Sequence, residues 1–152
     1  MDAERQFIEK YSLYFEMTGF MRMGGRILAW LLICDPPHQT MHQLVEVLQT
    51  SKSSISTATR YLIQAGFIER ISFPGQRRDY YQLRSDFISN SFERFVTRIG
   101  EMGKLVEHGL SILKGKPEEH RKRLKVLHDY FKFVHKEMPK LLKQWQNTDR
   151  GF

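Results

Sequence analysis

The chain has 152 residues, of which 41% are hydrophobic and 12% aromatic, so it can form a packed core and is not intrinsically disordered. Its 24 Lys and Arg residues exceed its 17 Asp and Glu residues, which gives a net charge of +7. The single cysteine, Cys34, excludes an internal disulfide framework and suits a reducing compartment. The N-terminal segment is charged and no apolar run exceeds the eight residues 27–34, so we expect a soluble cytoplasmic protein.

A first helix is predicted at residues 3–18, within an N-terminal dimerisation segment of residues 1–22. One face of this helix carries Phe7, Tyr11, Tyr14 and Thr18, with Ile8 and Phe15 beside it. Aromatic rings from this helix and the next one form a candidate cage for a quaternary ammonium ligand, held by cation–π attraction. The residues of this candidate site are Tyr11, Tyr14, Phe15 and Trp30. The alternative is that these rings are ordinary core aromatics.

Residues 26–34 are apolar on every side, which predicts a short helix buried all round. Asp35-Pro36-Pro37 should end this helix, because neither proline can donate a backbone hydrogen bond. Cys34 has two interpretations. A stabilised thiolate would make it a redox sensor, whereas burial beside Asp35 would raise its pKa and keep the thiol inert.

Two short helices separated by a tight turn are predicted at residues 41–49 and 51–66. Thr40 caps the first, Ser51 caps the second, and Gly66 ends the second. In the second helix the apolar residues recur every three or four positions, and no acidic residue occurs. Its other face carries hydroxyl and cationic side chains, which suit a surface that lies beside phosphates. This arrangement predicts a helix-turn-helix whose second helix recognises DNA.

A β-hairpin is predicted directly after the recognition helix. β-Branched and aromatic residues dominate segments 67–73 and 80–83, and Pro74-Gly75 begins the turn between them. Arg77 and Arg78 lie in this turn, where they suit a wing that reaches a narrow minor groove. A basic hairpin that contacts only solvent is the alternative.

The predicted DNA-contacting residues combine the outward face of the recognition helix with the two wing arginines. They are Ser51, Lys52, Ser53, Ser54, Ser56, Thr57, Arg60, Arg77 and Arg78. Positive charge is concentrated here, because residues 51–84 contain six Lys or Arg side chains against only Glu69 and Asp79. A winged-helix module that binds an acidic protein partner through the same basic face is the alternative function.

The C-terminal part, residues 85–152, is predicted to form two further helices for dimerisation. The first begins near Ser85 and runs for about 28 residues, with Gly109 interrupting its apolar repeat. The second begins at Glu118, with Pro139 expected to kink or restart it. Apolar residues follow each other in steps of three and four along both helices, so each needs a partner surface of similar length. We therefore expect a homodimer that reads a pseudo-palindromic DNA site.

The run LVEVLQTSKSSISTATRYLIQAGFIERISFPGQRRDYYQL resembles the winged helix-turn-helix of MarR-type transcriptional regulators. The segments GGRILAWLL, DPP and PGQRRDYYQL look most like the GbsR-like branch, which implies choline or betaine as an effector. The resemblance places DNA contacts at Ser51, Lys52, Ser53, Ser56 and Thr57 and assigns the wing arginine to Arg78. The acidic residue usual in the family two places before that arginine is Gln76 here, and Asp79 is a candidate substitute.

No pattern of residues indicates catalysis or a cofactor. Gly24-Gly25 is an isolated pair and not a phosphate loop, and no serine or cysteine lies in a nucleophile motif. Of the histidine pairs, His38 lies outside the helix that contains His42, and His128 and His135 lie seven residues apart. The expected protein is a mainly α winged helix-turn-helix with a small β-hairpin wing. Its expected divisions are a core at residues 23–84 and dimerisation helices at 1–22 and 85–152, and we expect it to act as a transcriptional repressor without metal or cofactor.

Overall fold

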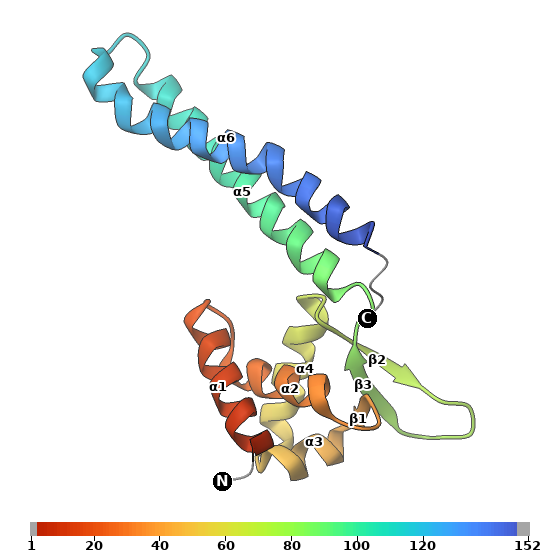
Figure 1. The fold of residues 1–152 in the computed structure, drawn as a ribbon. Helices are drawn as coiled ribbons and strands as arrows, with labels where there is room; N and C mark the ends of the chain where they lie inside the picture. The colour runs from red at the N-terminus through yellow and green to blue at the C-terminus, as the bar shows by residue number, and fades with distance from the viewer. Residues whose placement is uncertain (1–2, 149–152) are drawn as a thin grey trace. The chain divides into compact units, whose positions relative to one another are not determined.

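The computed structural model describes residues 3–148. The chain divides into two compact units with the boundary between Phe87 and Ile88. The first unit contains four helices and a three-stranded sheet, and the second is a hairpin of two long helices (Figure 1). This confirms the predicted mainly α winged helix with additional N- and C-terminal helices. None of the helices in the described range is long and apolar enough to cross a membrane.

The helices of the first unit enclose its core. Their bounds are Ala3–Met17 for α1, Arg22–Ile33 for α2, Met41–Leu48 for α3 and Lys52–Gln64 for α4. Side chains from α2, α3 and α4 meet in the core, where Ile27, Leu44, Ile55 and Leu62 have no exposed surface. Burial of several large aliphatic side chains stabilises the unit by about 1.5–3 kcal/mol for each.

Helix α1 packs against α2 through the side that carries Ile8 and Phe15. Its buried residues are Ile8, Ser12 and Phe15, whereas Phe7 is 38% and Tyr14 69% exposed. The cause is the glycine pair of α2, because a Cβ atom on Gly25 would lie 2.8 Å from Ser12 Cα. Small residues let the two helices approach closely, and the contact turns Phe7 and Tyr14 outward.

Helix α2 differs from its prediction. It begins four residues earlier, at Arg22, and is not buried all round, because Ile33 near its end is 40% exposed. Gly24 and Gly25 lie inside this helix, where both are buried. Their low helix propensity hid the first turn in the sequence, and packing against α1 outweighs that propensity.

The sheet has three antiparallel strands in the order β1-β3-β2. Strand β1 spans His38–Thr40, β2 spans Ile68–Ser72 and β3 spans Asp79–Leu83. The β2–β3 hairpin is the predicted wing, and it projects from the helices (Figure 1). The sequence did not predict β1, since three residues are too few to show a strand pattern and its partner β3 lies about forty residues further on.

The second unit packs helix α5 (Phe87–Ile112) against helix α6 (Glu118–Gln146) as an antiparallel hairpin (Figure 1). Helix α5 agrees with the long helix predicted from Ser85, whereas α6 does not restart at Pro139. Helix α5 continues through Gly109, because the missing side chain makes room for Leu124, whose Cδ1 would lie 3.2 Å from a Cβ there. Helix α6 continues through Pro139, which lies on its exposed side, where water can bond the carbonyl that proline leaves free.

Candidate nucleic-acid interface

Helix α4 is fixed at both ends as the sequence predicts. The Ser51 Oγ accepts a hydrogen bond of 3.2 Å from the backbone N–H of Ser54. After the helix, Gly66 has a φ of 73°, a left-handed conformation that glycine adopts without a steric penalty. Helix α3 ends similarly close by, with Gln49 in a left-handed conformation before the turn. Both ends of α4 are therefore held, which fixes the direction of its side chains.

The two faces of α4 have opposite character. Ile55, Ala58 and Leu62 point into the core and are fully buried. On the outward side Ser51, Lys52, Ser53, Thr57 and Arg60 are exposed, and Ser54 and Ser56 are half-buried. The helix contains no acidic residue. Its outward face therefore presents hydroxyl and cationic donors without a carboxylate that would repel phosphates.

The two cations of α4 are available for a ligand. Neither Lys52 nor Arg60 forms an ion pair or a side-chain hydrogen bond with the part of the chain that is described. Thr59 is different, because its hydroxyl donates to the carbonyls of Ile55 and Ser56 at 2.9 and 3.1 Å and the residue is buried. Thr59 therefore has a structural role within α4.

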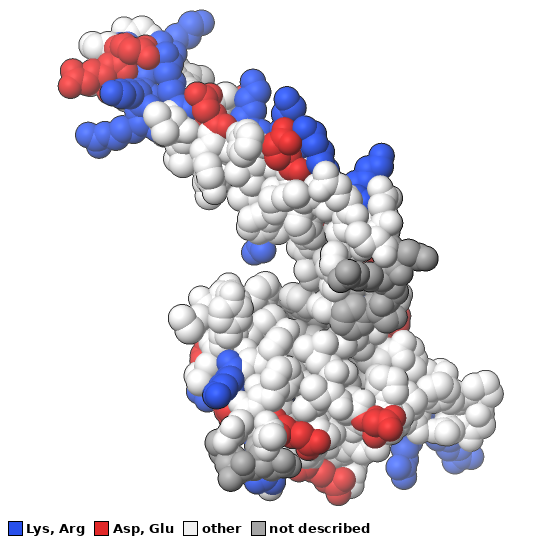
Figure 2. Space-filling model, in the orientation of Figure 1, with Lys and Arg blue, Asp and Glu red and all other residues white. Residues whose placement is uncertain are grey.

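The wing places Arg77 and Arg78 in an exposed turn. Gly75 adopts a φ of 79° there, and the Gln76 N–H donates to the Phe73 carbonyl at 3.0 Å. Neither arginine is paired with a described residue. Lys and Arg side chains gather on this hairpin (Figure 2). The wing thus carries two exposed cationic side chains on a defined turn.

The support of the wing differs from what the sequence suggests. Asp79 does not approach Arg78; its carboxylate instead pairs with Arg70 Nη1 at 3.4 Å. Gln76 accepts a hydrogen bond from the Tyr80 hydroxyl. The ring of Tyr80 also packs on Phe73 and His38, with ring centroids 5.0 and 5.2 Å away. Tyr80 is therefore a supporting residue that sequence analysis missed, since one of its partners, His38, belongs to the distant strand β1.

The four aromatic residues of the candidate cage are not gathered by ring contacts. Tyr11 and Phe15 stack with their centroids 6.2 Å apart. Phe15 is buried and stacks on Phe20 as well. Among the described residues, Tyr14 and Trp30 make no ring contact with this pair, and Tyr14 points to solvent. Phe15 therefore acts as a core aromatic.

Cys34 is buried at the end of α2. Burial raises the pKa of its thiol, and the negative charge of Asp35 raises it further, against the lowering effect of hydrogen bonds from its own backbone and Gln39. Both features predict an unreactive thiol, as the sequence suggests.

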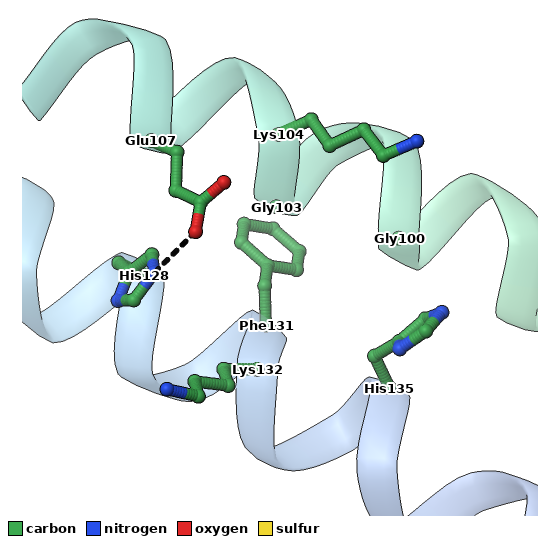
Figure 3. Close-up of a pocket in the computed structure, with 8 residues that line it drawn as sticks. All are labelled: Gly100, Gly103, Lys104, Glu107, His128, Phe131, Lys132 and His135. Carbon is green, nitrogen blue, oxygen red and sulfur yellow. Dashed lines mark hydrogen bonds and ion pairs between the residues drawn. The ribbon is translucent and has the colours of Figure 1, made fainter. Parts of the chain in front are cut away.

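A shallow pocket lies between α5 and α6, where Gly100 and Gly103 leave space for side chains of α6 (Figure 3). His128 Nε2 lies 3.3 Å from Glu107 Oε1, and its Nδ1 lies 3.3 Å from Asp129. Phe131 separates His128 from His135, so the two imidazoles do not converge (Figure 3). Within residues 3–148 no three His, Cys, Asp or Glu side chains are grouped to hold a metal ion.

A helix-turn-helix with an outward polar recognition helix and an adjoining basic β-hairpin defines the winged-helix class of DNA-binding folds. A family model described as MarR family matches residues 23–79, and one described as MmpR5-like MarR family transcriptional regulator matches residues 86–148. The HTH-type transcriptional regulator MmpR5 of Mycobacterium tuberculosis is 36% identical over 129 residues, which cover 85% of this chain and 78% of the relative. The chain belongs to the MarR family of transcriptional regulators, which bind DNA.

Two further relatives support this assignment. A crystal structure of a transcriptional regulator is 32% identical, covers 96% of this chain and 99% of its own, and superposes with a TM-score of 0.79. The HTH-type transcriptional repressor OpcR of Bacillus subtilis is 28% identical over 93 residues, which cover 61% of this chain and 50% of that protein. Members of this family are regulators and not enzymes, which agrees with the absence of a catalytic motif in the sequence.

Proposed function

We propose that the protein is a sequence-specific repressor that binds double-stranded DNA as a homodimer on a pseudo-palindromic operator. The observation that carries the proposal is the outward face of α4, which is exposed, free of carboxylates and lined by hydroxyl and cationic groups. In winged-helix proteins this helix enters the major groove, where Ser and Thr contact either kind of base pair.

The distribution of unpaired cations supports DNA as the ligand. Lys52 and Arg60 on α4 and Arg77 and Arg78 on the wing are all exposed. Cations on two neighbouring elements suit the two grooves of a duplex, with the wing arginines reaching the minor groove. Neutralising phosphates releases condensed counterions, so this arrangement favours binding that weakens with salt.

The uncovered side of the α5–α6 hairpin supports the homodimer. Large apolar side chains remain exposed along both helices, among them Leu105, Ile112, Val126 and Phe133. The charged residues of the hairpin lie mostly along one long edge, and the other edge is largely uncharged (Figure 2). A second copy that covers these apolar residues would present two α4 helices, and two-fold symmetric proteins read half-sites about one duplex turn apart.

Repression, the GbsR-like branch and the effector are the finer parts of the proposal. The name of the Bacillus subtilis relative supports repression. Release by choline or betaine would require rearrangement of Tyr14 and Trp30 towards Tyr11, since these rings are separate here. A thermal-shift titration of the protein with choline or betaine tests this effector. If millimolar ligand does not stabilise the protein, this effector class is excluded.

The DNA-binding proposal is tested by selecting duplexes from random DNA with the whole chain and measuring affinity across a salt series. We expect Lys52→Ala to weaken every duplex and to reduce the slope of log affinity against log salt by about one. Arg78→Ala should weaken most the sites with an A·T-rich flank, where the minor groove is narrow. If both variants bind DNA as the wild type does, the interface is misassigned.

The alternative of an acidic protein partner makes a different prediction. A folded protein has no condensed counterion layer like that of a duplex, so its binding should depend much less steeply on salt. The alternative would be favoured if the selection enriches no duplex and if the chain binds an acidic protein with an affinity that depends only weakly on salt.

A further inference from the structure

A groove of about 560 Å³ separates helix α4 from the sheet of the wing. On the helix side it is lined by Ser56, Arg60 and Ile63, which lie at helical spacing along one flank of α4. On the sheet side it is lined by Arg70 and Tyr81. These two residues are directly paired across β2 and β3, so their side chains stand on the same face of the sheet.

The base of the groove is fixed by the core. Ile68 lies two residues before Arg70 on the same face of β2, and it is 1% exposed. The Phe67 N–H donates to the Leu62 carbonyl at 2.9 Å, which joins the end of α4 to the start of β2. The separation of the two walls is therefore set by packed, hydrogen-bonded structure.

Two cations, Arg60 and Arg70, and the hydroxyls of Ser56 and Tyr81 are available to an anion in the groove. Arg60 is unpaired within the described residues, and Arg70 contacts Asp79 only at 3.4 Å, with both side chains more than half exposed. Such a surface pair contributes little, so a phosphate can replace it. Tyr81 is only 8% exposed, and its hydroxyl makes no hydrogen bond with any described residue. The Tyr81 hydroxyl oxygen is itself open to solvent, so it can donate to a ligand in the groove.

Of the remaining charged residues of the groove, Arg84 is matched by a carboxylate, and Glu69 keeps its negative charge and bonds a neutral amide. Arg84 forms a two-point ion pair with Asp86, with Nε–Oδ1 and Nη2–Oδ2 distances of 2.7 Å. Glu69, the acidic residue that lines the groove, accepts a hydrogen bond of 2.9 Å from Gln82. The free donors therefore gather around Arg60, Arg70 and Tyr81.

We propose that this groove binds a phosphate of the DNA backbone, held by Arg60, Arg70 and the Tyr81 hydroxyl. The inference rests on the proposed DNA-binding function. With α4 in the major groove and the wing arginines in the neighbouring minor groove, the sugar–phosphate backbone that divides the two grooves must pass between α4 and the wing. Arg70 and Tyr81 thus fix the position of the duplex and carry no sequence information themselves.

Salt-dependent affinity of the whole chain for a selected duplex tests the assignment. Arg70→Ala should weaken binding by about 3- to 10-fold at physiological salt and reduce the salt slope by about one. Tyr81→Phe should weaken binding by about 3-fold and leave the slope unchanged, because a neutral hydroxyl releases no counterion. Arg123→Ala, which removes the same charge from an exposed position on α6, should change neither quantity. Thermal melting checks that each variant is folded.

The phosphate that contacts the groove can be located with a set of duplexes, each of which carries one uncharged methylphosphonate at a different backbone position. At one backbone position, removal of the phosphate charge should weaken DNA binding by the wild type. The same change should not alter DNA binding by Arg70→Ala. The groove assignment is overturned if Lys52→Ala weakens DNA binding while Arg70→Ala and Tyr81→Phe behave as Arg123→Ala does. It is also overturned if inorganic phosphate stabilises the wild type against heat, Arg70→Ala loses that effect, and both bind DNA equally, since the groove then binds a free anion. Failure of the wild type to bind any duplex would remove the DNA-binding proposal and the groove assignment together.

Discussion

The two units of the chain differ in how completely they bury their apolar side chains. The first unit has a continuous core that draws residues from α1 to α4 and from the sheet. In the second unit, Val106 is the one buried hydrophobic residue within the described part of the hairpin, and α6 has none. Both units contain large aliphatic and aromatic side chains at helical spacing, so the difference lies in what covers them. The first unit covers its own apolar surface, whereas the hairpin has a surface that a further chain can cover.

Under the proposed function, this difference in burial assigns a separate role to each unit. The packed unit holds α4 and the wing in fixed positions, because α4, β2 and β3 each bury side chains in the core. The hairpin contributes an extended apolar surface and few fixed polar groups. A regulator that must hold two recognition helices at a set distance needs both properties, one in each unit.

The largest expected effect comes from placing a charge on the uncovered face of the hairpin. Phe133 is 65% exposed, so Phe133→Glu should leave the single chain folded but prevent a second copy from covering this face. Losing the paired arrangement should lower operator affinity by about 100-fold or more. Light scattering together with DNA titration measures both effects.

Lys143→Glu is the matched control, because it is an exposed position on the charged side of α6. This variant should remain a dimer, and its DNA affinity should change only as expected from the altered net charge. If Phe133→Glu remains a dimer with wild-type affinity, the apolar face of the hairpin is not the interface between copies.

A pair of glycine substitutions compares packing in the two units. A Cβ atom at Gly25 would lie 2.8 Å from Ser12 Cα, a backbone atom that cannot yield without moving α1. Gly25→Ala should therefore reduce the free energy of unfolding by about 1–3 kcal/mol, as overpacked cores do. Chemical denaturation followed by circular dichroism measures this change.

Gly100→Ala provides the contrast in the hairpin. Its Cβ would also lie 2.8 Å from a neighbour, but that atom is the Nε2 of the exposed His135, which can rotate away. Alanine favours helix over glycine by about 1 kcal/mol, so this variant should be neutral or more stable. Equal destabilisation by both substitutions would show that the hairpin packs as rigidly as the first unit.

The smallest expected effect concerns Cys34. Burial and the Asp35 carboxylate raise the pKa of its thiol, so near neutral pH it should react with iodoacetamide several-fold more slowly in the folded chain than in urea. Cys34→Ser should keep DNA affinity, and peroxide should not release DNA from the wild type. Rapid labelling of the folded chain, with peroxide release that Cys34→Ser abolishes, would instead make Cys34 a redox sensor.

The parts of the interface that depend on local chemistry could be predicted from the sequence. The Ser51 cap, the left-handed Gly66 and the turn at Gly75 follow from the conformational preferences of these residues, and all three are present. The inward stripe of α4 also follows from its spacing. These features placed the recognition helix and the wing correctly.

The features that could not be predicted depend on contacts between distant segments. Gly24 and Gly25 concealed the first turn of α2 in the sequence, but packing against α1 keeps this helix continuous. The partners of Gln76 and Asp79, and the shared face of Arg70 and Tyr81, appear only when the strand register is known. The count of basic residues in segment 51–84 included Arg70, but the sequence gave no reason to place this residue beside α4.

The central claim is that two copies of the chain present their α4 helices to successive turns of one duplex. A hydroxyl-radical footprint on a selected duplex, combined with the mass of the complex, tests it most directly. We expect two protected segments with centres about 10 base pairs apart and two chains bound, with binding lost when five base pairs are inserted between the segments. One protected segment with a single chain bound, or a footprint unchanged by the insertion, would contradict it.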